Sequence, residues 1–125
     1  MGTAKGRTRW QPLAAGVLLT LLAFQVCGGA RASSATFDEP YHLGAGYAYL
    51  KTGDGRLASD HPPLLDLWVA LPLLGLSLHL PLESRAWQQA EYGSFGDVFL
   101  WQANAERAQE ILWWARLPNL ALALV

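Results

Sequence analysis

Apolar segments without charge stand near the beginning of the chain and at its end. Residues 10–30 contain no charged side chain, and a helix needs about 20 mostly apolar residues to cross a bilayer. Residues 117–125 are also free of charge, but they are too few to span. We therefore expect a transmembrane helix at residues 10–30 and the start of a second, truncated one at residues 116–125.

Three stretches between these segments predict shorter helices. Thr36 is a helix-capping residue, and Glu39 follows at the spacing of a capping box, so we expect a helix over about residues 38–50. An apolar run over residues 64–80 follows two consecutive prolines, which suit the start of a helix. Asn104 can cap a further helix, extending to residue 114.

We expect these helices to lie at the membrane surface, within a loop over residues 31–115. Trp68 suits an interfacial anchor, and Pro72 is expected to kink the run over residues 64–80. Residues 81–103 mix proline, glycine, serine and acidic residues. That composition is typical of a loop, and no chemistry is evident in it.

The basic N-terminus predicts the orientation. Residues 1–9 carry three basic side chains and no acid, and positive charge favours the cytoplasmic side of a membrane helix. A cleavable signal peptide fits equally well, with processing between Ala32 and Ser33. Both interpretations place the residues after Ser33 in an extracytoplasmic compartment.

Composition narrows the function classes. Hydrophobic residues make up 52% of the chain and charged residues 15%, against about 25% charged in soluble domains. Residues 38–125 carry five basic and ten acidic side chains, so no basic patch predicts nucleic-acid binding. The single Cys27 offers neither a disulfide framework nor a zinc pattern.

The stretch from Thr36 to Leu65 carries the candidate chemistry. Asp38 and His42 are four residues apart and would share one face of a helix. A carboxylate at a membrane surface can act as a general base towards a hydroxyl group. The alternative is that the acidic residues only favour the helix N-terminus. The glycines of Gly44-Ala45-Gly46 do not form a nucleotide-binding fingerprint and are expected to allow close helix packing.

A second polar cluster, Asp60-His61, stands immediately before the two prolines. Asp and His are both ligands of divalent metals, although two ligands do not make a site. A capped turn explains the same residues. Arg56 is a candidate for contact with a phosphate, and a solvated turn is the alternative.

Together these motifs resemble one family. An Asp-Glu pair after a first membrane helix is followed by an aromatic helix, then Gly-Asp-x-Arg-Leu, then His-Pro-Pro-Leu. This order is similar to the start of the polytopic glycosyltransferases of the GT-C fold, in particular the protein mannosyltransferase and aminoarabinose transferase group. The similarity runs from about Val17 to the end of the chain and includes the spacing to Ala115-Arg116-Leu117-Pro118.

The resemblance implies roles for individual residues. Asp38 matches the acid that activates the acceptor for inverting attack on the sugar, and Glu39 is its companion. Asp60 matches a position that contributes to divalent-metal binding in some members. His61 matches a donor-proximal position that is histidine in mannosyltransferase-like members and a phosphate-contacting lysine in aminoarabinose-transferase-like ones. His42 is a further candidate for substrate binding.

We therefore expect an all-α integral membrane protein: the N-terminal fragment of a multi-pass glycosyltransferase of the cell membrane. The resemblance implies a polyprenyl-phosphate sugar as donor and a protein, lipid or polysaccharide as acceptor, on the extracytoplasmic side. Residues 1–125 alone are expected to be inactive. The alternatives are a secreted binding module and a small structural membrane subunit.

Overall fold

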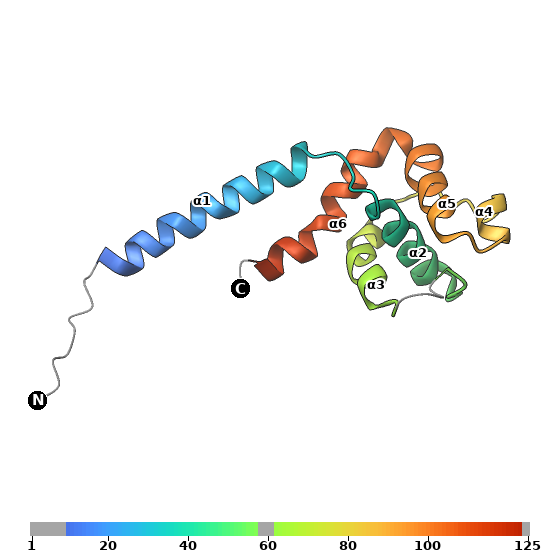
Figure 1. Cartoon of the computed structure of the whole chain (residues 1–125), viewed down its shortest axis with the longest axis horizontal. Coiled ribbons are helices and arrows are strands. Elements are labelled where there is room, and N and C mark those ends of the chain that lie inside the picture. Colours follow the sequence, from blue (N-terminus) through green and yellow to red (C-terminus); the bar gives the residue numbers. More distant parts are fainter. Residues whose placement is uncertain (1–9, 58–61, 124–125) are drawn as a thin grey trace, which may run out of the picture.

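The computed structural model describes residues 10–57 and 62–123, and every regular element in these ranges is a helix (Figure 1). The predicted all-α class is thus confirmed for the described residues. In chain order the elements are α1 (Trp10–Ala32), α2 (Glu39–Thr52), α3 (Leu64–Ala70), η1 (Leu71–Gly75), α4 (Arg85–Gln88), α5 (Tyr92–Asp97), η2 (Val98–Ala103), η3 (Ala105–Arg107) and α6 (Ala108–Ala123).

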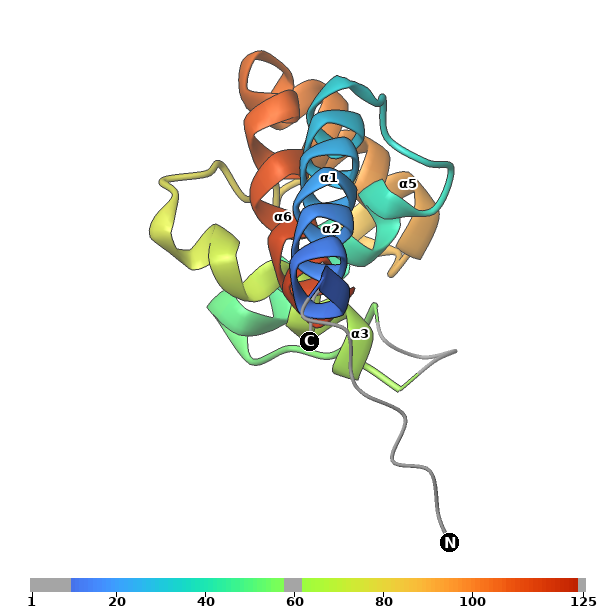
Figure 2. The same cartoon turned by 90° about the vertical axis from the view of Figure 1, so that its left-hand side faces the viewer.

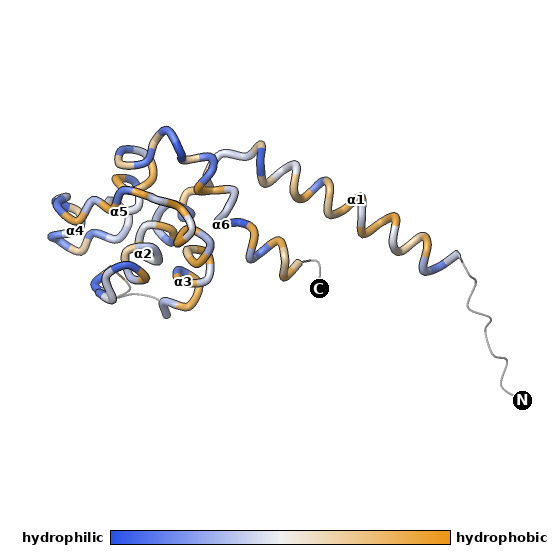
Figure 3. The backbone as a smooth tube through the Cα atoms, turned by 180° about the vertical axis from the view of Figure 1, so that it is seen from behind, coloured by the Kyte–Doolittle hydropathy of each residue, from blue (hydrophilic) through white to orange (hydrophobic). Residues whose placement is uncertain are grey.

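Helix α1 is long enough and apolar enough to cross a membrane. Its 23 residues rise about 34 Å at about 1.5 Å per residue, against a hydrocarbon core of about 30 Å. None of its residues is buried, and apolar positions recur along its whole length (Figure 3). The prediction of an apolar helix of spanning length is confirmed, and the helix continues two residues beyond the expected end.

The C-terminal half of α1 contacts α6, and Figure 2 shows the two helices overlapping when viewed along α1. The contact face of α1 carries small side chains, including Ala23 and the half-buried free thiol of Cys27. A cavity of about 110 Å³ lies between this face and Leu120 and Ala123 of α6. Small residues suit such a contact because they let two helix backbones approach closely.

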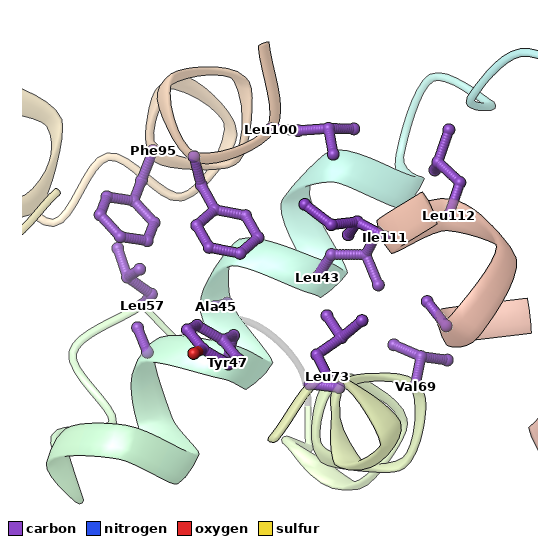
Figure 4. Close-up of a cluster of buried hydrophobic side chains, with 14 of the residues drawn as sticks. Leu43, Ala45, Tyr47, Leu57, Val69, Leu73, Phe95, Leu100, Ile111 and Leu112 are labelled. Carbon is purple, nitrogen blue, oxygen red and sulfur yellow. The ribbon is translucent and has the colours of Figure 1, made fainter. Parts of the chain in front are cut away.

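Helix α2 is the centre of a helical body formed by residues 39–57 and 62–115, and Figure 1 shows it between α3 and α5. Its side chains Leu43 and Tyr47 are fully buried, as is Phe95 of α5 (Figure 4). The ring of Phe99 in η2 lies 5.4 Å from that of Tyr47, measured between ring centres. Ile111 of α6 closes the same apolar core. Burying side chains of this size contributes about 1.5–3 kcal/mol each, so tertiary packing stabilises these short helices.

Glycine allows α2 to contact both of its neighbours at the backbone. A Cβ atom at Gly46 would overlap the carbonyl oxygen of Asp66 in α3. A Cβ atom at Gly96 of α5 would lie 2.5 Å from the carbonyl oxygen of Pro40. Gly44 faces Gly96, where an added Cβ would lie 3.0 Å from the glycine Cα. The expectation that the glycines of α2 serve close helix packing is confirmed.

Residues 81–103 contain more regular structure than their loop-like composition indicated. This segment contains α4, α5 and the π-helical turn η2. Its local composition gives a weak helical signal because Gly93 and Gly96 disfavour a helix. The apolar core overrides that tendency, since Trp87, Phe95 and Phe99 are all buried in it.

The predicted helix over residues 64–80 is shorter than expected. Helix α3 ends at Ala70, the tighter turn η1 follows to Gly75, and Leu76 is already extended. Pro72 stands at the start of η1 and lacks the N–H group that an α-helix requires, so the expected break occurs there. The apolar run continues beyond it without helical structure.

The helices expected on either side of residue 115 form one continuous helix. A single helix, α6, runs from Ala108 to Ala123 and includes Pro118. The short turn η3 precedes it, where the sequence predicted a helix beginning after Asn104. The side chain of Asn104 instead bonds the backbone of His79, both to its N–H and to its carbonyl oxygen, and donates to the carbonyl of Phe99.

Gly46→Ala is expected to destabilise the fold, although alanine normally favours a helix by about 1 kcal/mol over glycine. The added methyl group overlaps the backbone of Asp66, which cannot rotate away, and overpacking costs about 1–3 kcal/mol. We expect the melting temperature of the purified protein in detergent to fall by several degrees. Gly75→Ala is the matched control, because a Cβ atom there meets nothing within 4 Å. An unchanged melting temperature in Gly46→Ala would contradict the backbone contact.

Candidate functional site

Asp38 lies immediately before α2, and its carboxylate is free of the helix N–H groups. Helix α2 begins at Glu39, with Asp38 rather than Thr36 as its capping residue. The Thr36 hydroxyl donates to Asp38 Oδ1 over 3.0 Å, and the Thr36 backbone N–H donates to Glu39 Oε2 over 2.8 Å. Half of the expected capping box is therefore present, and the Asp38 side chain remains 66% exposed.

His42 faces Asp38 one helical turn further along α2. Its Nε2 lies 3.8 Å from Asp38 Oδ2, so the prediction that the two residues share a face is confirmed. Its other ring nitrogen, Nδ1, lies 2.6 Å from Oδ1 of Asp66. The hydroxyl of Tyr92 lies 2.8 Å from the same nitrogen. Helices α2, α3 and α5 thus each contribute a polar group to one cluster.

The partners of His42 differ in exposure and charge. Asp66 is buried, with 7% of its side chain exposed, and a buried acid requires a polar partner such as this imidazole. Burial, together with the carboxylates of Asp66 and Asp38, raises the pKa of Tyr92 well above its usual value. Tyr92 is therefore a neutral hydroxyl at physiological pH.

Glu39 and Arg116 form a bidentate ion pair that links α2 to α6. Arg116 Nε donates to Oε1 of Glu39 and Nη2 donates to Oε2, each over 2.7 Å. The same guanidinium also donates to the backbone carbonyls of Ala30, Ser33 and Ser34. One side chain therefore holds together the end of α1, the start of α2 and the middle of α6.

The ion pair also alters the titration of Glu39. Burial alone would raise the pKa of this carboxyl, but the Arg116 guanidinium and the Thr36 N–H outweigh it and lower the pKa below its usual value. A lowered pKa in the folded state means that ionised Glu39 stabilises the fold above the usual carboxyl pKa. That stability is lost as the pH falls through the folded-state pKa.

A polar cavity of about 220 Å³ opens beside these groups. Its lining comes from α2, α3, α6 and the segment before α2: Thr36, Asp38, Glu39, His42, Leu43, Leu65, Val69, Ala115, Arg116 and Asn119. An apolar groove of about 470 Å³ adjoins it and shares Leu65 and Asn119, with Leu64, Trp68 and Leu122 completing the groove. A charged recess and an apolar surface thus meet at one edge.

Arg56 does not reach this cavity. It follows the C-terminal end of α2, and this end lies about 15 Å from His42 along the helix axis. Its guanidinium donates to Asp54 Oδ2 over 2.6 Å and lies 4.6 Å from the centre of the Trp87 ring. The structure therefore supports the solvated turn that the sequence left as an alternative.

Asp60 and His61, the other two predicted site residues, lie outside the described residues. Within residues 10–57 and 62–123, no three His, Cys, Asp or Glu side chains come together as metal ligands. The predicted metal position therefore remains a prediction.

Three residues at the site, Asp66, Arg116 and Tyr92, are not among those that the sequence predicted. Asp66 had a signal, since it is the one charge in the apolar run over residues 64–80. Arg116 had a weaker one, as the last charge before the final apolar segment. Tyr92 had none, because its role depends on how α5 packs against α2. Comparison with known protein families, curated proteins and solved structures finds no match to this chain.

Glu39→Gln is expected to destabilise the protein by about 1–3 kcal/mol at neutral pH, because it removes charged hydrogen bonds to a largely buried guanidinium. Thermal unfolding in detergent between pH 3 and 7 measures the effect. The wild type should lose stability as the pH falls below about 4.5, the usual pKa of the group, and the variant should show a flatter profile.

Glu110→Gln is the matched control, since Glu110 also binds an arginine but on an exposed surface. It should leave both the melting temperature and its pH dependence near the wild-type values. Identical pH profiles for Glu39→Gln and the wild type would show that the ion pair does not stabilise the fold.

Proposed function

We propose that the protein is a membrane glycosyltransferase that moves a sugar from a polyprenyl-phosphate donor to an acceptor hydroxyl. The observation that carries this proposal is the position of Asp38. Its exposed carboxylate lines the polar cavity, beside the apolar groove and close to the end of a helix of spanning length. The motif resemblance identifies this same residue as the base.

Sugar transfer by a single displacement needs a general base beside the acceptor hydroxyl, and a carboxylate can serve as that base. In a single displacement, the acceptor oxygen forms a bond to the anomeric carbon while the bond to the phosphate oxygen breaks. The acceptor proton must leave at the same stage, and a positioned carboxylate accepts it. Asp38 suits this role because no helix N–H group engages its side chain and the carboxylate is mostly exposed.

The neighbouring apolar groove supports an amphiphilic donor. A polyprenyl-phosphate sugar has a charged head and a hydrocarbon tail, so it needs a polar recess next to an apolar surface. Leu65 and Asn119 belong to the lining of both spaces. Leu64, Trp68 and Leu71 also leave an exposed apolar stripe along α3 and η1, which suits contact with the membrane interface.

Glu39 has a supporting role in this proposal. Its two carboxylate oxygens are engaged by Arg116 and Thr36, so it holds the cavity wall while Asp38 faces the substrate. The guanidinium of Arg116 is equally occupied and is not assigned to the leaving phosphate. Asp60 and His61 remain the residues proposed for that part of the site.

The proposed topology places residues 1–9 in the cytoplasm and the site outside. Basic residues before α1 favour this orientation, and α6 would re-enter the bilayer as part of a multi-pass protein. The polar cluster lies beyond the C-terminal end of α1, where Arg116 of α6 binds the carbonyls of the connecting segment. This arrangement would put the cavity level with the head groups of lipid-linked donors.

Asp38→Asn is expected to reduce sugar transfer by about 10²–10⁴-fold, because the amide cannot accept the acceptor proton. The complete protein as its gene encodes it is assayed in membranes, with radiolabelled polyprenyl-phosphate mannose and polyprenyl-phosphate glucose as donors. Incorporation into protein, lipid and polysaccharide fractions is measured separately.

Asp54→Asn is the matched control, since Asp54 lies at the opposite end of α2 in a pair with Arg56. It should retain wild-type transfer and membrane insertion. Full activity in Asp38→Asn would refute the assignment of the base. Absence of transfer from both donors by the wild-type protein would count against this donor class.

A further inference from the structure

One ring nitrogen of His42 has hydrogen-bond partners, and the other faces the polar cavity. Asp66 and Tyr92 both approach Nδ1, at 2.6 and 2.8 Å. The ring of Tyr92 packs edge-on against the imidazole, with the two ring centres 6.0 Å apart. Nε2 points the opposite way, towards Asp38 and the polar cavity that His42 lines.

The buried carboxylate selects the tautomer of His42. While Asp66 is a carboxylate it accepts hydrogen bonds and cannot donate them, so the short contact favours a hydrogen on Nδ1, with the Tyr92 hydroxyl as a second acceptor. In the neutral ring, Nε2 then has a free lone pair. That lone pair faces the carboxylate of Asp38, 3.8 Å away, so the exposed Asp38 side chain must rotate slightly before the two atoms come within hydrogen-bond distance. This is the arrangement in which a buried acid orients a histidine for proton transfer.

Helix packing makes the arrangement rigid. Asp66 reaches His42 because Gly46, one turn along α2, lets the backbone of α3 approach α2 directly. Tyr92 reaches it because Gly96 allows the same approach by α5 against Pro40. A histidine with only a packing role would need neither a buried acid at Nδ1 nor a cavity on the Nε2 side.

We propose that His42 is a second catalytic residue: its Nε2 takes up the proton that Asp38 has removed from the acceptor hydroxyl. Asp66 is the residue that positions His42. The inference rests on the proposed glycosyl transfer. The acceptor O–H bond breaks and its oxygen bonds to the anomeric carbon. The phosphate leaves with the electron pair of the bond that breaks. The proton passes from Asp38 Oδ2 to His42 Nε2, which restores the Asp38 carboxylate and leaves an imidazolium between two carboxylates.

The charges around His42 suit this transfer. Asp38 stands on its own helix, Asp66 approaches from α3 and the neutral Tyr92 from α5. Across the cavity, Arg116 of α6 is paired with Glu39, so its positive charge is balanced. An imidazolium at position 42 therefore gains two nearby carboxylates without facing an unpaired cation among the described residues.

The tautomer is the first test, and it does not depend on transferase activity. The full protein is labelled with ¹⁵N-histidine in detergent micelles, and two-dimensional NMR distinguishes a hydrogen on Nδ1 from one on Nε2. The His42→Gln variant identifies the His42 signals by their loss. We expect neutral His42 to carry its hydrogen on Nδ1 and to shift towards the Nε2-protonated form in Asp66→Asn. A wild-type hydrogen on Nε2 would overturn the proposal.

Kinetics of the complete protein provide the second test. Asp66→Asn and His42→Gln should each lower kcat by about 10²-fold with little change in KM, and should remove the same ionisation from the pH profile of kcat. The side-chain amide of the glutamine can still donate a hydrogen bond to Asp66. We therefore expect His42→Gln to fold even if Asp66→Asn does not. Asp54→Asn again serves as control.

The outcomes separate this inference from the proposed function. Unchanged kcat and pH profile in His42→Gln would refute the catalytic role while leaving Asp38 as the base. If instead the wild type transfers no sugar, the proposed function fails and the catalytic role of His42 fails with it. The NMR result would still show whether Asp66 orients the ring. If both variants lose stability while the pH profile of kcat stays unchanged, His42 and Asp66 have only a structural role.

Discussion

The candidate site depends on backbone contact between α2 and its two neighbours. At Gly46 and Gly96 there is no space for even a methyl group between the helices. These contacts place Asp66 and Tyr92 close enough to share one nitrogen of His42. A larger residue at either glycine would separate the helices, and the polar cluster would lose its geometry before the apolar core lost its burial.

A second interaction joins this helical body to the membrane-length helix. The Arg116 guanidinium binds the Glu39 carboxylate and three backbone carbonyls at the end of α1 and just after it. Through these bonds Arg116 of α6 also fixes the short connection between α1 and α2. Because the ion pair also lines the polar cavity, the shape of the cavity depends on the same contact.

The two carboxylates of the Asp-Glu pair illustrate how packing divides similar residues into different roles. Glu39 is engaged on both oxygens and has a lowered pKa. The Asp38 side chain is mostly exposed, accepts a hydrogen bond from the Thr36 hydroxyl and lies near His42. Composition and spacing do not distinguish the two adjacent acids, and only the family resemblance assigned them different roles. Their surroundings make one of them a structural anchor and leave the other available to a substrate.

The sequence by itself determined the helical class, the apolar helix of spanning length, the existence of α2 and the shared face of Asp38 and His42. These features follow from composition and from spacing within a single helix, which are local properties. Only the tertiary structure brought Asp66, Tyr92 and Arg116 to the site, from 24, 50 and 77 positions away from their partners. Contacts over such separations depend on which helix faces pack together, and no local pattern encodes that choice.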